Sequence, residues 1–124
     1  MEIREDRSYT QDHEWIWIDG DLSVVGITDF AQEQLGEVVY VELPTVGSVV
    51  EVGEPFGVVE STKSVSDLYA PISGEIVEVN AMLVDAPEQV NASPYEDGWM
   101  VKIRRSDNSD DLLTANQYRE HVGG

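Results

Sequence analysis

Short runs rich in valine, isoleucine and tyrosine alternate with polar residues along most of the chain, and turn residues interrupt them at short intervals. This pattern is typical of half-buried strands, so the sequence predicts a mainly β fold. Trp15–Ile18 and Leu22–Ile27 flank Asp19-Gly20-Asp21 and predict a β-hairpin. Two further strands are predicted over Val38–Leu43 and Trp99–Arg104.

Capping residues predict the helices. Thr28 is a favourable N-cap and Gly36 a stop signal, which together predict a short helix over Asp29–Leu35. Thr114-Ala-Asn-Gln117 has the spacing of a capping box and predicts a C-terminal helix over 114–122.

Two connecting segments have weaker signals. Asp85-Ala-Pro-Glu88 predicts one short helical turn with Pro87 near its start. Ser106–Asp111 is polar and acidic, and we expect it to be a solvated loop.

A faint internal repeat aligns Gly47–Glu54 with Gly74–Ala81. Gly53 matches Asn80, and both residue types tolerate positive φ. The repeat implies two similar β-units related by a pseudo-twofold axis, with Lys63 on the connection between them. A chance match in a valine-rich chain is the alternative.

The length of 124 residues and the hydrophobic content of 41% indicate one globular domain over 1–124 with a single core, and we place the β core at about 24–105. No apolar run approaches the length that spans a bilayer. Near the N-terminus, acids mix with arginines, which fits neither a secretory signal nor a transit peptide. We expect a cytoplasmic protein, or a mitochondrial matrix protein if the chain is a processed form.

The formal charge of −18 disfavours nucleic acid and anionic membranes as partners, because both attract lysine and arginine. Such a charge favours solubility and attraction to basic surfaces, and we expect a monomer. A highly solvated surface, as in a salty cytoplasm, is the simpler alternative.

Catalytic chemistry has little support in the sequence. The chain has no cysteine and only two histidines, His13 and His121. It contains no nucleophile-elbow, H-E-x-x-H, Walker A or G-x-G-x-x-G motif. We therefore expect no catalytic and no metal-binding residues.

Lys63 is the residue that stands out. It is one of two lysines, and it lies between Val58-Val59 and Val65–Leu68, which predict a hairpin with Lys63 at the tip. An amine on a defined mount is a good acceptor for a covalent prosthetic group, although a solvated turn lysine is the alternative. The other lysine, Lys102, is expected to face solvent from a strand.

The segment around Lys63, Gly-Val-Val-Glu-Ser-Thr-Lys-Ser-Val-Ser-Asp, closely resembles the lipoyl-lysine segment of the glycine cleavage system H proteins. The resemblance covers nearly the full length. Its other motifs are Asp12–Trp15, Gly26–Gln34, Leu35–Pro44, Ala70–Glu75 and Ser93–Met100.

This resemblance implies a lipoyl-domain-like barrel-sandwich hybrid of two small antiparallel sheets, with short helices and a C-terminal helix. It also implies a non-catalytic carrier with lipoate attached to Lys63. In that family the arm takes the aminomethyl group of glycine from the pyridoxal-phosphate glycine decarboxylase to the aminomethyltransferase. Dihydrolipoamide dehydrogenase then reoxidises the arm. The dithiol chemistry belongs to the cofactor, in agreement with a chain that has no cysteine.

Three further site residues follow from the resemblance. Glu60, three residues before the lysine, and Gly74, eleven after it, match positions that help the lipoylating enzyme to recognise the domain. The alternatives are an exposed strand acid and a turn glycine. Glu14 is the candidate carboxylate that holds the amine of the loaded arm, and a surface acid before a core Trp15 is its alternative.

Several related readings remain. Biotin carriers usually place their lysine between methionines, whereas Thr62 and Ser64 flank Lys63. A lipoyl domain of a 2-oxoacid dehydrogenase would bring a Pro/Ala-rich linker and the pattern Asp-Lys-Ala, and the chain has neither. An H-like protein that relays lipoyl groups to other enzymes, or an acidic interaction module with unmodified Lys63, stays open.

Overall fold

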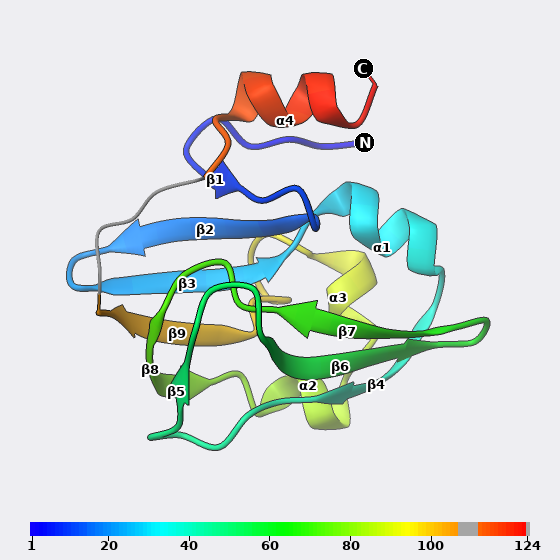
Figure 1. Cartoon of the computed structure of the whole chain (residues 1–124). Coiled ribbons are helices and arrows are strands. Elements are labelled where there is room, and N and C mark those ends of the chain that lie inside the picture. The colour runs from blue at the N-terminus through cyan, green and yellow to red at the C-terminus, as the bar shows by residue number, and fades with distance from the viewer. Residues whose placement is uncertain (107–111, 124) are drawn as a thin grey trace.

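The structure is a computed structural model that describes residues 1–106 and 112–123, and Figure 1 shows how the elements are arranged. Within these residues the strands are β1 Ser8–Tyr9, β2 Glu14–Asp19, β3 Leu22–Ile27, β4 Val38–Glu42, β5 Val49–Val50, β6 Pro55–Ser61, β7 Val65–Tyr69, β8 Gly74–Val79 and β9 Val101–Arg105. The helices are α1 Asp29–Leu35, α2 Met82–Asp85, α3 Gln89–Ala92 and α4 Ala115–His121.

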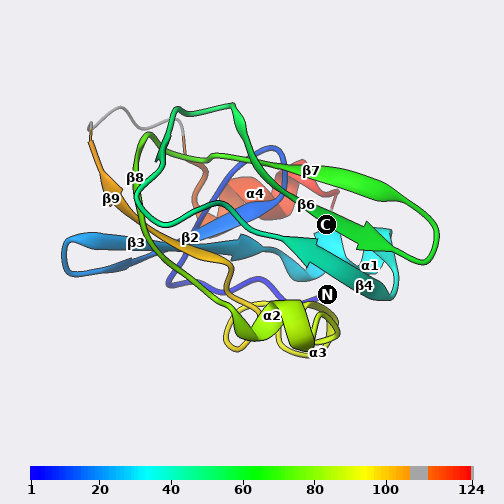
Figure 2. The same cartoon turned by 90° about the horizontal axis from the view of Figure 1, so that it is seen from below.

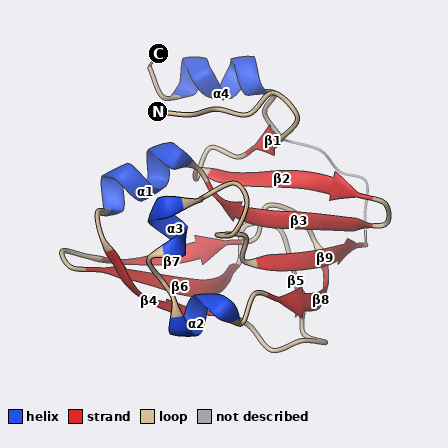
Figure 3. Cartoon of the chain, turned by 180° about the vertical axis from the view of Figure 1, so that it is seen from behind, coloured by secondary structure: helices blue, strands red, loops and turns tan. Residues whose placement is uncertain are grey.

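The strands of the described residues form two antiparallel sheets. The larger sheet has the order β1-β2-β3-β9-β8-β5, and the smaller sheet has the order β4-β6-β7. Figure 2 shows the β6–β7 tip and the β2–β3 turn at opposite ends of the molecule, and Figure 3 shows α1, α2 and α3 along one side. The predicted mainly β fold of two small sheets with short helices and a C-terminal helix is confirmed.

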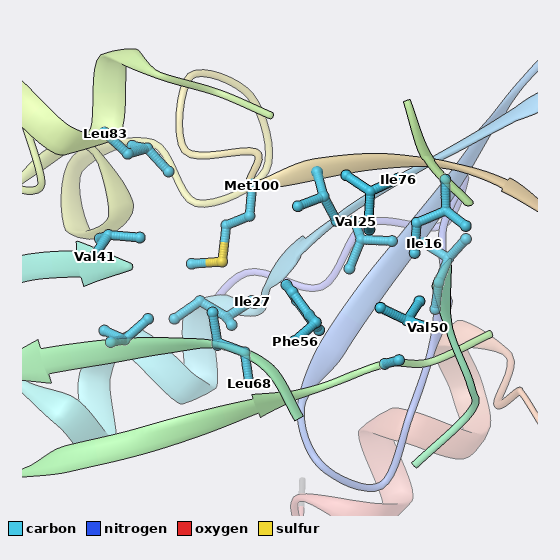
Figure 4. Close-up of a cluster of buried hydrophobic side chains, with 14 of the residues drawn as sticks. Ile16, Val25, Ile27, Val41, Val50, Phe56, Leu68, Ile76, Leu83 and Met100 are labelled. Carbon is cyan, nitrogen blue, oxygen red and sulfur yellow. The ribbon is translucent and has the colours of Figure 1, made fainter. Parts of the chain in front are cut away.

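The main core lies between the two sheets (Figure 4). Ile16 and Val25 contribute from the larger sheet, and Val41, Val59 and Leu68 from the smaller one, all nearly inaccessible to solvent. Each such aliphatic side chain contributes about 1.5–3 kcal/mol when it leaves water. The core therefore holds the smaller sheet, which includes the Lys63 segment, firmly against the larger one.

The local signals for the first hairpin and for both capped helices are confirmed. The β2–β3 hairpin pairs Asp19 with Leu22, and Gly20 has a φ of 63°. The Thr28 hydroxyl accepts a hydrogen bond from the Ala31 amide at the start of α1. At α4, the side chains of Thr114 and Gln117 cap each other's backbone amides, as the capping box predicts.

Two predictions about connecting segments need correction. The predicted helical turn with Pro87 near its start is present, since the Val90 amide donates to the Pro87 carbonyl at 3.1 Å, but its bounds differ. It continues into α3, which begins at Gln89, and a separate helix, α2, ends at Asp85. Pro87 explains the break, since its ring excludes Ala86 from helical geometry, and Ala86 has φ −134° and ψ 62°. The last core strand begins at Val101 rather than Trp99. The predicted polar loop lies, beyond Ser106, outside the described residues.

The two segments of the faint repeat lie side by side in the larger sheet, where β5 pairs with β8. Gly53 has a φ of 87°, whereas Asn80 does not adopt positive φ, so the expected equivalence of these two residues is wrong. Asn80 is buried, and its Nδ2 donates to the carbonyls of Asp97 at 2.9 Å and Trp99 at 2.8 Å. The role of Asn80 is therefore to hydrogen-bond these two carbonyls through its side chain, not to allow a positive φ.

Gly74 is buried at the start of β8, where it pairs with Val50 on one side and Arg105 on the other. It is therefore a strand residue and not a turn glycine. A Cβ at this position would lie 2.3 Å from the carbonyl oxygen of Arg104, which leaves no room for a side chain.

We predict that Gly74→Ala lowers the free energy of unfolding by about 2 kcal/mol or more, because the sheet must separate to admit the methyl group. Urea unfolding measures this loss. The exposed neighbour provides the control, since Glu75→Ala should change stability by no more than about 0.5 kcal/mol. Equal stabilities of the two variants would contradict the packing argument.

Candidate functional site

The tip of the β6–β7 hairpin is a two-residue loop, Thr62-Lys63, between Ser61 and Ser64. The Ser61 amide donates to the Ser64 carbonyl at 2.8 Å. The Ser61 hydroxyl in turn accepts from the amides of Lys63 at 3.3 Å and Ser64 at 3.1 Å. A serine side chain thus satisfies the turn amides, which explains how this hairpin closes without an Asn-Gly or Asp-Gly pair.

The tip is also attached to the body of the protein near the end of α1 (Figure 1). The Thr62 amide donates to the Glu37 carbonyl at 3.0 Å. A Cβ on Gly36 would lie 3.3 Å from Lys63 Cε, so the lysine stem crosses the backbone at Gly36. Lys63 itself is exposed. The loop therefore holds the backbone of Lys63 in place while its amine stays accessible.

Lys102 has a different environment. Its Nζ lies 3.5 Å from Glu78 Oε1 and 5.0 Å from the centroid of the Trp99 ring. Its side chain is 26% exposed, so the prediction of a simple solvent-facing lysine needs correction. A neighbouring carboxylate and an indole ring partly cover it. Of the two lysines, Lys63 is the accessible one.

A cleft of about 720 Å³ begins beside the lysine tip. Its walls are residues 11–14 on one side, α1 on another, and the β7 edge from Ser64 to Tyr69. Gln34 of α1 and Asp67 of β7 line it, together with Glu14. The cleft thus connects the neighbourhood of Lys63 with the candidate carboxylate.

Glu14 is only 3% exposed, so the alternative of a surface acid is wrong. The Thr10 hydroxyl donates to its Oε1 at 2.7 Å. Burial nevertheless dominates and raises the pKa of Glu14 to about 8, with a smaller contribution from the nearby Asp12 carboxylate. The carboxyl group is therefore largely neutral at neutral pH. The sequence could not reveal this, because burial depends on how residues 11–14 pack.

The two expected recognition residues lie in different places. Glu60 is half-buried on β6, the central strand of the smaller sheet, between Tyr40 and Val65 and close to the tip. Gly74 belongs to the larger sheet, and Figure 1 shows β8 at the end of the molecule opposite the tip. The structure brings Glu60, but not Gly74, to Lys63.

In residues 1–106 and 112–123, no group of three or more His, Cys, Asp or Glu side chains is arranged to hold a metal ion. Within the same part of the chain, no helix is long and apolar enough to cross a membrane.

The fold and the site together define a carrier domain of the lipoyl type, in which two antiparallel sheets present a lysine at a hairpin tip. A family model for the glycine cleavage H-protein matches residues 7–123. The chain belongs to this family.

Individual relatives agree. The chain is 60% identical to the glycine cleavage system H protein of Anaeromyxobacter sp. (strain K) over 124 residues, covering 98% of this chain and 97% of the relative. It is 51% identical to that of Staphylococcus carnosus (strain TM300), with 99% of each covered. The crystal structure of a glycine cleavage system H protein from Mycobacterium marinum superposes with a TM-score of 0.92 at 49% identity, covering 98% of this chain and 100% of the other.

The raised pKa of Glu14 makes a prediction about stability. In the unfolded chain this carboxyl ionises near pH 4.5, and in the folded protein near pH 8. The folded state therefore holds an extra proton between these values, and the stabilising contribution is lost as pH rises through that range. We predict that Glu14→Gln, which cannot ionise, is more stable than the natural chain at pH 9 by about 4–5 kcal/mol, because the two pKa values differ by about 3.5 units.

Urea unfolding from pH 4 to pH 9 tests this prediction. The difference between the two proteins should shrink toward pH 4. Glu42→Gln, which changes an exposed carboxyl, is the matched control and should follow the natural chain throughout. If the free energies of unfolding of Glu14→Gln and the natural chain differ by the same amount at every pH, the raised pKa of Glu14 is wrong.

Proposed function

We propose that this chain is the lipoyl-bearing carrier of a glycine cleavage system, with lipoate attached to Lys63. The observation that carries the proposal is the accessible Lys63 on a fixed hairpin tip, in a chain of this family whose other lysine is ion-paired. Lipoate, when bound, supplies the disulfide that takes up the aminomethyl group of glycine and is reduced. The chain itself contributes no catalytic group.

The proposed partners follow from this role. They are the lipoylating enzyme, the pyridoxal-phosphate glycine decarboxylase, the aminomethyltransferase and dihydrolipoamide dehydrogenase. A tether on Lys63 raises the effective concentration of the cargo at each partner to about the millimolar range. The relatives named above are all glycine cleavage proteins, which disfavours the alternative of a lipoyl relay.

Glu14 is the proposed contact for the amine of the cargo. A protonated amine that enters the cleft would favour the ionised carboxylate, so Glu14 would lose its proton as the amine docks. A charge-assisted hydrogen bond in a shielded site stabilises by about 1.5–3 kcal/mol. The neutral carboxyl of the empty cleft avoids the cost of a buried charge until the amine arrives.

The first prediction concerns the site of attachment. Lys63→Arg keeps the charge but removes the amine that can be acylated, so a lipoylating enzyme should add no lipoyl group to it. Lys102→Arg is the matched control and should gain the full mass increment. With the partner enzymes present, glycine-dependent NADH formation should follow the modification. A lipoylated Lys63→Arg protein would contradict the proposal.

The second prediction concerns recognition by the lipoylating enzyme. Glu60→Ala should lower kcat/KM for lipoylation by about tenfold, which corresponds to one lost charge-assisted contact. Its stability should stay within about 1 kcal/mol of the natural chain. Glu42→Ala, on the neighbouring strand, is the control. Unchanged kinetics in folded Glu60→Ala would exclude the contact. Gly74 is buried in the other sheet, so we propose that it assists recognition only through the position of β8.

The third prediction concerns the cleft. Glu14→Gln should shorten the lifetime of the aminomethyl-loaded protein by about tenfold in the absence of the transferase, because the amine loses its charged partner. Lipoylation should be unchanged. The effect should be larger at pH 8 than at pH 6, since Glu14 ionises more readily at the higher pH. If the loaded Glu14→Gln protein and the loaded natural chain have equal lifetimes at pH 6 and at pH 8, Glu14 has no role in holding the cargo.

A further inference from the structure

The C-terminal helix contacts both walls of the cleft through one side chain. Tyr118 of α4 is completely buried. Its hydroxyl lies 2.8 Å from His13 Nδ1, in the wall formed by residues 11–14, and 2.7 Å from Thr28 Oγ1, at the start of α1. On the same helix, His121 Nε2 lies 3.0 Å from the Gln11 carbonyl. The loop between β1 and β2 meets the start of α1 in Figure 1, with α4 above β1.

Thr28 gives this hydrogen-bond chain a direction. Its Oγ1 already accepts from the Ala31 amide at 3.2 Å, as the N-cap of α1. A hydroxyl has one proton to donate, and the Tyr118 hydroxyl is the acceptor that the described residues offer it. In the histidine tautomer whose Nδ1 carries no proton, Tyr118 then donates its own proton to His13 Nδ1. Burial raises the pKa of Tyr118 to about 12, so the phenol keeps this proton.

His13 in turn fixes the wall that contains Glu14. It has a φ of 70°, a conformation that no other non-glycine residue among those described adopts. Its carbonyl accepts from the Thr28 amide at 3.0 Å, and its ring lies 4.7 Å from that of Phe30. The orientation of His13 therefore determines where the next residue, Glu14, enters the cleft.

We propose that Tyr118 is a positioning residue of the cleft: its hydroxyl joins His13 to Thr28, so that α4 holds both walls in place while His13 is neutral. That the cleft receives the cargo amine rests on the proposed function. That Tyr118 fixes the walls of the cleft does not rest on it.

Protonation of His13 would reverse the direction of the hydrogen bonds that link His13, Tyr118 and Thr28. Nδ1–H would donate to Tyr118, Tyr118 would donate to Thr28, and the buried Thr28 proton would lose its acceptor. The ionisable groups around His13 are Tyr118 and His121 of α4, with Asp12 and Glu14 on its own segment. Burial lowers the pKa of His13, the His121 ring at 5.5 Å lowers it further, and Asp12 opposes them. The hydrogen-bonded connection of the two cleft walls through Tyr118 is therefore present above the ordinary histidine pKa. It is lost as pH falls through the lowered pKa of His13.

Amide hydrogen exchange on the unlipoylated protein tests the proposal. Tyr118→Phe should reduce the protection factors of residues 13–14 and 28–31 about tenfold at pH 7.5, the effect of one lost buried hydrogen bond. Because Glu14 titrates in both proteins, the comparison is their difference: the excess protection of these amides in the natural chain over Tyr118→Phe should shrink as pH falls below 6.5. Thr28→Ser retains the hydroxyl and should behave as the natural chain.

Tyr9→Phe is the matched control. Tyr9 stacks on Tyr118 with ring centroids 4.6 Å apart, but its hydroxyl bonds to the backbone of Arg4 and not to the chain of Thr28 and His13. It should leave the protection of both segments unchanged. Equal protection in Tyr118→Phe and Tyr9→Phe, or an unaltered pH profile in Tyr118→Phe, would overturn the proposal.

The two proposals fail separately. If Glu14→Gln does not change the lifetime of the loaded protein, the docking of the cargo is wrong, while hydrogen exchange still decides whether Tyr118 holds the walls. If docking is correct, Tyr118→Phe should also shorten that lifetime, and Tyr9→Phe should not.

Discussion

The fixed position of the β6–β7 hairpin is the constraint on which the site depends. Phe56, Val59 and Leu68 point from this hairpin into the core, so its base cannot move without opening the space between the sheets. Its tip is held by the Ser61 hydroxyl and the Glu37 carbonyl. Because both ends are fixed, Lys63 can carry a mobile group on an immobile mount.

The cleft solves a second problem, which is how to receive a cation without storing a buried charge. The chain has 25 acidic residues, yet the one in the cleft wall that is almost completely buried has a raised pKa. A neutral Glu14 is compatible with a stable empty cleft, and it can become charged when a cation neutralises it. The exposed acids have a different effect, since they raise the rate of encounter with basic partners more than the affinity.

Much of the local structure could be predicted because it depends on neighbours in sequence. Thr28 and Gly36 set the limits of α1, and Lys63 was identified as a hairpin tip from its flanking valines. The failures lie where tertiary packing decides. Pro87 separates two short helices, each with its own buried side chain, Leu83 in α2 and Val90 in α3, whereas the sequence predicts only one helical turn there.

The candidate site was only partly visible in the sequence for the same reason. The motif around Glu14 identified the residue, but its burial and raised pKa arise from packing of the cleft wall. Tyr118 has no motif at all, and its hydroxyl meets a histidine that lies 105 positions earlier in the chain. Lys63 is central to the account, so its chemical state in the cell is the most direct test. Mass spectrometry of the chain isolated from its native host, with peptide mapping, should find one lipoyl group on the peptide that contains Lys63. An unmodified chain in a host that lipoylates other proteins, or a lipoyl group on Lys102, would contradict the account.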